Sequence, residues 1–103
     1  MCGIIGINSN KPVSSTIINS LKKLEYRGYD SAGIATLSGG IINEVKSEGR
    51  VDNLEKNSLV QSMEGSIGIG HVRWATHGSP NSVNAHPHSS QNVSVVHNRI
   101  IEN

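Results

Sequence analysis

A glycine turn between two apolar stretches is the feature that most limits the fold of this chain. Ser38-Gly39-Gly40 separates residues 31–37 from residues 41–45, and both stretches carry mainly small and aliphatic side chains. Apolar runs joined by so short a glycine turn are typical of a β-hairpin. Strands joined in this way pair antiparallel, because a parallel pair needs a crossover of about a dozen residues or more. The fold must therefore contain an antiparallel sheet.

Other apolar patterns predict the elements around this hairpin. Further strands are expected at residues 2–7, 66–72 and 93–96. A helix is predicted to begin at Ser14 or Ser15, either of which can cap it, and to stop near Gly28. A second, less regular helix is predicted over residues 51–63, and a long polar loop follows the strand at 66–72. The mixture predicts one α+β domain over residues 1–103.

Charge and cysteine content narrow the expected partners and compartment. Nine Lys and Arg face eight Asp and Glu, without a basic stripe or an acidic tail. Neither nucleic acid nor a membrane surface is therefore an expected partner. Cys2 is the single cysteine and cannot form an intrachain disulfide. The chain shows no signal-peptide pattern and no apolar run of transmembrane length, so we expect a cytoplasmic protein.

Cys2 is the first candidate catalytic residue. Initiator methionine is normally removed before a small residue, which would leave Cys2 with both a thiol and a free α-amine. The thiolate is the nucleophilic form of cysteine. An α-amine, with a reference pKa of about 7.7–8.0, is well matched to the role of general base. Nucleophile and base then share one residue, an arrangement suited to attack on an amide. The alternative is that Cys2 is a small buried apolar residue.

Arg73 and Trp74 lie in the second candidate cluster, Gly70-His71-Val72-Arg73-Trp74-Ala75-Thr76-His77-Gly78, at the end of a predicted strand. Arginine there can hold a substrate carboxylate through two parallel hydrogen bonds, and Trp74 can close over a pocket. The alternative is a surface arginine and a core tryptophan.

Histidines are concentrated in and before the predicted polar loop, where four of the five lie between His71 and His88. Neither a His-Glu-x-x-His motif nor a cysteine pair accompanies them, so we expect no metal. Further along, Asn98 ends a predicted strand and can direct its amide N–H at a developing oxyanion. The alternative is an ordinary turn asparagine.

Four segments taken together resemble one known family. They are Cys2-Gly3-Ile4-Ile5-Gly6, residues 24–35 (LEYRGYDSAGIA), the cluster at 70–78, and Asn84-Ala85-His86-Pro87-His88. In this order and spacing they resemble class II glutamine amidotransferases, members of the N-terminal-nucleophile hydrolases. The resemblance is greater to the branch that aminates a sugar phosphate than to the branches of purine, asparagine or glutamate synthesis.

This resemblance implies a fold and a reaction. The fold is an αββα sandwich of two antiparallel sheets between helices, of which this chain would hold about the first half. In the reaction, Cys2 attacks the side-chain amide of glutamine, ammonia leaves, and water then frees glutamate from a thioester. Asn98 and the backbone N–H of Arg99 would form the oxyanion hole. No cofactor is implied.

The resemblance also assigns substrate-binding roles. Arg73 would hold the α-carboxylate of glutamine, and the pocket would be shaped by Trp74, Thr76 and His77. Arg27 and His86 would support the site. Ammonia would pass to a sugar-isomerising domain that makes glucosamine 6-phosphate from fructose 6-phosphate.

Two departures from the family pattern leave a second function open. The chain is expected to be a truncated glutaminase domain, so the missing segment and the isomerase domain would have to come from elsewhere. Arg99 also stands where the family has glycine, the default residue where backbone approaches a ligand closely. One expectation is a working glutaminase module with such a partner, and the alternative is a non-catalytic remnant.

Overall fold

An antiparallel four-stranded sheet forms the centre of the structure, a computed structural model. The described residues are 3–25, 30–73, 87–89 and 94–95. The sheet has the order β1 (Gly3–Asn8), β4 (Ile67–Arg73), β2 (Ser31–Ser38) and β3 (Ile41–Glu48). The helices are α1 (Ser14–Leu24), α2 (Val51–Glu55) and α3 (Ser58–Gln61). A separate two-stranded sheet pairs β5 (His88–Ser89) with β6 (Ser94–Val95).

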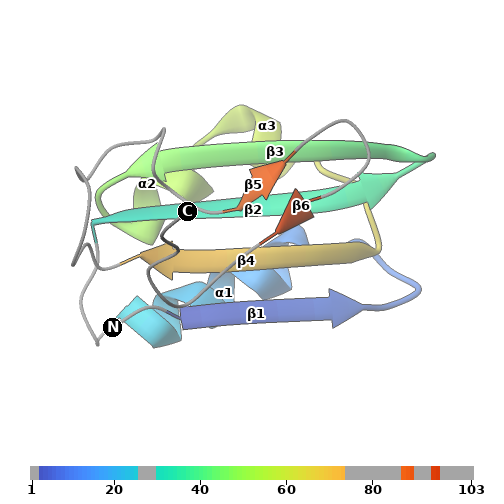
Figure 1. Cartoon of the computed structure of the whole chain (residues 1–103). Helices are drawn as coiled ribbons and strands as arrows, with labels where there is room; N and C mark the ends of the chain where they lie inside the picture. Colours follow the sequence, from blue (N-terminus) through green and yellow to red (C-terminus); the bar gives the residue numbers. More distant parts are fainter. Residues whose placement is uncertain (1–2, 26–29, 74–86, 90–93, 96–103) are drawn as a thin grey trace, which may run out of the picture.

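The elements lie in layers. The three helices cover one face of the four-stranded sheet, and β5 and β6 lie over the opposite face (Figure 1). All strand pairs between described residues are antiparallel. The prediction of an α+β fold with an antiparallel sheet is therefore confirmed. None of the described helices is both long and apolar enough to span a membrane.

The predicted hairpin is present and sets the register of β2 on β3. Ser38 pairs with Ile41, which leaves Gly39 and Gly40 as the two loop residues. Their φ angles are +57° and +76°, and two positive φ values in succession are what a two-residue hairpin loop of the favoured twist requires. The returning strand continues to Glu48, beyond the predicted end at residue 45.

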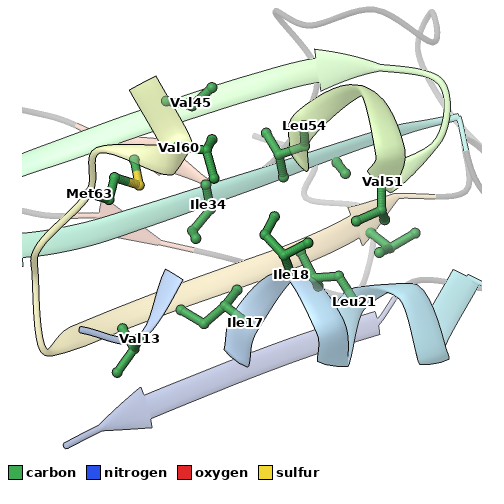
Figure 2. Close-up of a cluster of buried hydrophobic side chains, with 12 residues drawn as sticks. Val13, Ile17, Ile18, Leu21, Ile34, Val45, Val51, Leu54, Val60 and Met63 are labelled. Atoms are coloured by element: carbon green, nitrogen blue, oxygen red, sulfur yellow. The ribbon is translucent and has the colours of Figure 1, made fainter. Parts of the chain in front are cut away.

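An aliphatic core joins the helices to the sheet, as the absence of Phe from the sequence requires. Ile17, Ile18 and Leu21 of α1 are almost fully buried. They lie against the sheet beside Ile34 of β2, and α2 adds Leu54 to the same cluster (Figure 2). Because these residues recur at helical spacing, they form one apolar face, which is what the sequence pattern predicted.

Glycines in β4 let α1 approach the sheet closely. A Cβ atom on Gly70 would lie 2.6 Å from Ile17 Cγ2, and one on Gly68 would lie 2.7 Å from Ile17 Cδ1. Both distances are well below an ordinary carbon–carbon contact of about 3.5–4.0 Å. The missing side chains therefore create the space that Ile17 occupies.

Two details predicted for the first helix, its cap and its end, were wrong. The N-cap of α1 is Val13, which makes no side-chain cap, rather than Ser14 or Ser15. Val13 is anchored instead by its N–H, which donates to Gly65 O at 3.0 Å, and by burial of its side chain. The helix ends at Leu24, before the predicted stop near Gly28.

The helix predicted over residues 51–63 is two short helices, α2 and α3. Asn57 between them is extended, and its side chain accepts the Leu59 N–H at 2.9 Å, which starts a new helix. Strand β5 was missed, because the sequence around it is polar and was predicted to be a loop.

We expect Gly70→Ala to lower the free energy of unfolding by about 1–3 kcal/mol, because the added methyl overpacks the space that Ile17 fills. Gly6→Ala is the matched control, since its Cβ would meet only Ile69 Cγ2, at 3.9 Å. Urea unfolding followed by circular dichroism measures both. Equal losses in the two variants would contradict this account of the close approach.

Candidate functional site

The strand ends on one side of the four-stranded sheet form an edge that contains the described parts of three sequence motifs. β1 and β2 begin there, and β3 and β4 end there (left in Figure 1). Gly3, which follows Cys2 in the chain, pairs with Val72, and Ser31 pairs with Arg73. The antiparallel register therefore brings together segments that are far apart in the sequence.

Arg73 is the predicted site residue that the structure describes, and it ends β4. Its side chain is 11% exposed, and Nη1 lies 4.0 Å from Oδ1 of Asp30, whose side chain is 12% exposed. At this length the contact is an ion pair rather than a hydrogen bond. Two largely buried side chains of opposite charge thus meet at the sheet edge.

Asp30 is held at this edge through its backbone as well as its side chain. Its N–H donates to Arg73 O at 2.7 Å, and its carbonyl accepts the Gly49 N–H at 2.7 Å. The hydroxyl of Ser31 donates to Asp30 Oδ1 at 2.9 Å. One residue therefore ties the start of β2 to the end of β4 and to the residue after β3.

His71 and Arg73 share the face of β4 that points away from the helices. Successive strand residues alternate between faces, and Gly70, between the two neighbours His71 and Ile69, faces Ile17 of α1. His71 is fully buried. Arg73 therefore belongs to the face over which β5 and β6 lie (Figure 1). Pro87, from the fourth motif, is also fully buried.

Glu25 lies near the start of the motif at residues 24–35 and anchors it to α2. Its carboxylate is 8% exposed, accepts the Val51 N–H at 2.5 Å and lies 3.6 Å from Nη2 of Arg50. Glu25 follows α1, and Val51 begins α2. The carboxylate therefore satisfies a backbone donor at the start of α2, where a helix has no partner of its own for its first N–H groups.

A pocket of about 250 Å³ lies away from this edge, near the hairpin end of β3. It is lined by Ser38, Asn43, Glu44, Val45, Leu59, Ser62, Met63 and Glu64. None of these residues belongs to the four motifs, so the pocket gives no support to the predicted site. Within the part of the chain that the structure describes, no group of His, Cys, Asp or Glu could hold a metal ion.

Eight predicted site residues lie outside the described residues: Cys2, Arg27, Trp74, Thr76, His77, His86, Asn98 and Arg99. Sequence reasoning assigned no role to Asp30, Ser31 or Glu25. A signal for Asp30 was present, because the hairpin and the motif order place a carboxylate at the start of one strand and Arg73 at the end of another. The pairing of β2 with β4 is what brings the two side chains together, and the motifs alone do not give that pairing.

We expect Glu25→Ala to lower the free energy of unfolding by about 1–3 kcal/mol, because the buried Val51 N–H loses its acceptor. Glu55→Ala is the matched control. Glu55 accepts from Lys22 Nζ at 2.7 Å, a contact that raises the pKa of Lys22, but the Glu55 side chain is 47% exposed. Exposed pairs of this kind contribute little to stability, so Glu55→Ala should cost less than Glu25→Ala.

Chemical denaturation of the two variants measures these losses, and hydrogen exchange reports on the Val51 amide. Only Glu25→Ala should speed exchange at Val51. Unchanged exchange there would show that the carboxylate is not the cap of α2.

Two curated relatives of this chain have the same description. A glutamine–fructose-6-phosphate aminotransferase (isomerizing) of Bradyrhizobium diazoefficiens is 55% identical over 103 residues, all of this chain and 17% of the relative. The corresponding enzyme of Clostridium acetobutylicum is 56% identical over 105 residues, again all of this chain and 17% of the relative. The chain is thus similar, over its whole length, to the N-terminal part of these aminotransferases. No family model matches.

Solved structures give the same fold. Glutamine phosphoribosylpyrophosphate amidotransferase from B. subtilis, in complex with ADP and GMP, aligns with a TM-score of 0.73 at 27% identity, over 91% of this chain and 20% of that chain. An allosteric regulatory enzyme of purine biosynthesis aligns with a TM-score of 0.74 at 28% identity, over 84% of this chain and 18% of that chain. The fold is that of an N-terminal-nucleophile glutamine amidotransferase, represented here in part.

Proposed function

We propose that this chain is the first part of a glutaminase domain in which Cys2 releases ammonia from the side chain of glutamine. The observation that carries the proposal is the 55% identity, over the whole chain, to the N-terminal part of a glutamine–fructose-6-phosphate aminotransferase. The position of Arg73 supports it, because Arg73 ends β4 one residue after Val72, which pairs with the covalent neighbour of Cys2.

Cys2 supplies both nucleophile and base in the proposed reaction. After removal of Met1, the α-amine takes the thiol proton and the sulfur bonds to the amide carbon of glutamine. The protonated α-amine returns the proton to the amide nitrogen, which leaves the tetrahedral intermediate as ammonia and so produces a thioester. Water then attacks the thioester to release glutamate and restore the thiol. Asn98 and the backbone N–H of Arg99 are the proposed donors to the oxyanion in both steps.

Arg73 is the proposed partner of the α-carboxylate of glutamine. A guanidinium can donate two parallel hydrogen bonds to a carboxylate, which determines orientation as well as affinity. We assign pocket-shaping roles to Trp74, Thr76 and His77, and supporting roles to Arg27 and His86. The nucleophile must be reduced, which fits a cytoplasmic enzyme.

The fate of the ammonia is part of the same proposal. The chain spans 17% of the length of the aminotransferases that it matches. In the whole protein, ammonia would reach a sugar-isomerising domain that converts fructose 6-phosphate to glucosamine 6-phosphate. The remainder of the glutaminase domain and this second domain would be supplied by further polypeptide.

The first test replaces the matching N-terminal residues of the Bradyrhizobium aminotransferase with residues 1–103 of this chain. We expect this chimera to lose Met1 and to release glutamate from glutamine, and Cys2→Ala to reduce that rate to background. Mass spectrometry and a glutamate assay measure the two results. Retention of Met1, or activity that survives Cys2→Ala, would refute Cys2 as an N-terminal nucleophile. Absence of activity in the parent chimera would favour a non-catalytic remnant.

The second test concerns Arg99, where the family pattern has glycine. We expect Arg99→Gly to raise kcat of the chimera by up to about 10²–10³, because that is the usual loss when one oxyanion donor is removed or misplaced. A side chain that blocks the pocket would instead raise KM, so kinetics separate the two causes. Equal kinetic constants with Arg99 and with glycine would show that Arg99 does not impair the site.

A further inference from the structure

We infer that Asp30 is a positioning residue, which holds the guanidinium of Arg73 in the orientation that binds the α-carboxylate of glutamine. The inference rests on the proposed function, since it assigns Asp30 a task only if Arg73 binds that carboxylate. It adds a residue for which the sequence motifs gave no role.

The ion pair between Asp30 and Arg73 is well shielded from solvent. Its side chains are 12% and 11% exposed, with Nη1 4.0 Å from Oδ1. Charges this far from bulk water are screened less than surface charges. The attraction therefore restrains the long Arg73 side chain more than an exposed pair would.

Asp30 is itself held rigidly enough to serve as an anchor. Its backbone bonds to Arg73 O and to the Gly49 N–H, both at 2.7 Å, fix its Cα relative to β4. The Ser31 hydroxyl then orients the carboxylate through a 2.9 Å hydrogen bond to Oδ1. A group held by both backbone and side chain loses little entropy when it restrains another.

The side chain of Asp30 has a task that is separable from the structural task of its backbone. Neither of the two backbone bonds that join the strands uses the carboxylate. Asparagine at position 30 would keep the backbone donor, the acceptor and nearly the same volume. It would remove the negative charge that faces Arg73 and keep the two backbone bonds, so the charge can be tested while the strand connections are kept.

Two opposite effects on substrate binding must be weighed. The carboxylate of Asp30 competes with the substrate carboxylate for the positive charge, which would weaken binding. It also restrains the position of the guanidinium by charge, which favours a two-bond contact that depends on orientation. Because the 4.0 Å separation is longer than a hydrogen bond, Asp30 restrains Arg73 by charge without using an N–H in this contact. The positioning role requires that orientation be the larger effect, and a higher KM in Asp30→Asn would show it.

The test measures glutamine hydrolysis by the chimera that carries Asp30→Asn. We expect KM for glutamine to rise about tenfold with kcat changed less than about threefold, as when binding common to ground and transition states is lost. Asp52→Asn is the matched control. Asp52 pairs with Lys22 at 3.5 Å but is 53% exposed, on α2. This control should leave both constants unchanged.

A double-mutant cycle shows whether Asp30 acts through Arg73. In an Arg73→Ala background, Asp30→Asn should raise KM no further, because the group that it positions is gone. Ser31→Ala gives an independent variant, which loses only the donor to Oδ1 and should raise KM about twofold. Ser31→Ala decides the question if Asp30→Asn fails to fold by circular dichroism.

The outcomes separate the inference from the proposed function. An unchanged or lower KM for Asp30→Asn, or an additive effect in the Arg73→Ala background, would overturn the positioning role and leave the glutaminase intact. A parent chimera that binds L-glutamate in calorimetry but hydrolyses no glutamine would refute the glutaminase. In that case, glutamate affinity still tests Asp30 and should fall about tenfold in Asp30→Asn. A parent that binds no glutamate would overturn both.

Discussion

The close approach of α1 to the sheet is the constraint on which the other contacts depend. Gly68 and Gly70 in β4 leave room for Ile17, and Gly3 in β1 leaves room for Leu24, whose Cβ would lie 2.9 Å from an added methyl. Because protein interiors pack as densely as crystals, a helix cannot retreat by the width of a methyl without opening voids beneath it. The glycines therefore determine how closely α1 approaches the sheet.

The packing of α1 on the sheet also positions the candidate site, because the ends of α1, β1 and β4 lie there. Gly3 lies under Leu24, and Gly3 pairs with Val72, so the start of β1, the end of α1 and the end of β4 meet. Glu25, which follows α1, then connects this region to the start of α2 by accepting the Val51 N–H. The nucleophile motif, the motif at 24–35 and the arginine motif are thus brought to one edge by a core that contains none of the proposed catalytic groups.

Sequence reasoning succeeded where the signal was local. The positive-φ pair Gly39–Gly40 and the apolar face of Ile17 and Leu21 both follow from short-range patterns. It failed where a distant partner decided the outcome. Val13, the N-cap of α1, is anchored by Gly65, which accepts its N–H, and Asp30 meets Arg73 because of strand register. The resemblance named Arg73 but not its neighbour, since a motif reports residue identity and not contact.

The Asp30–Arg73 pair is better explained by function than by stability. Removing two charges from water costs several kcal/mol per ion, and a buried pair seldom stabilises more than apolar residues of the same size would. The strand ends here are already joined by backbone bonds through Asp30, which any residue other than proline could make. The carboxylate is therefore not needed to join the strands, although its charge compensates that of the largely buried Arg73. It also supplies a fixed negative charge beside a guanidinium, which is the arrangement needed to present that guanidinium in one orientation.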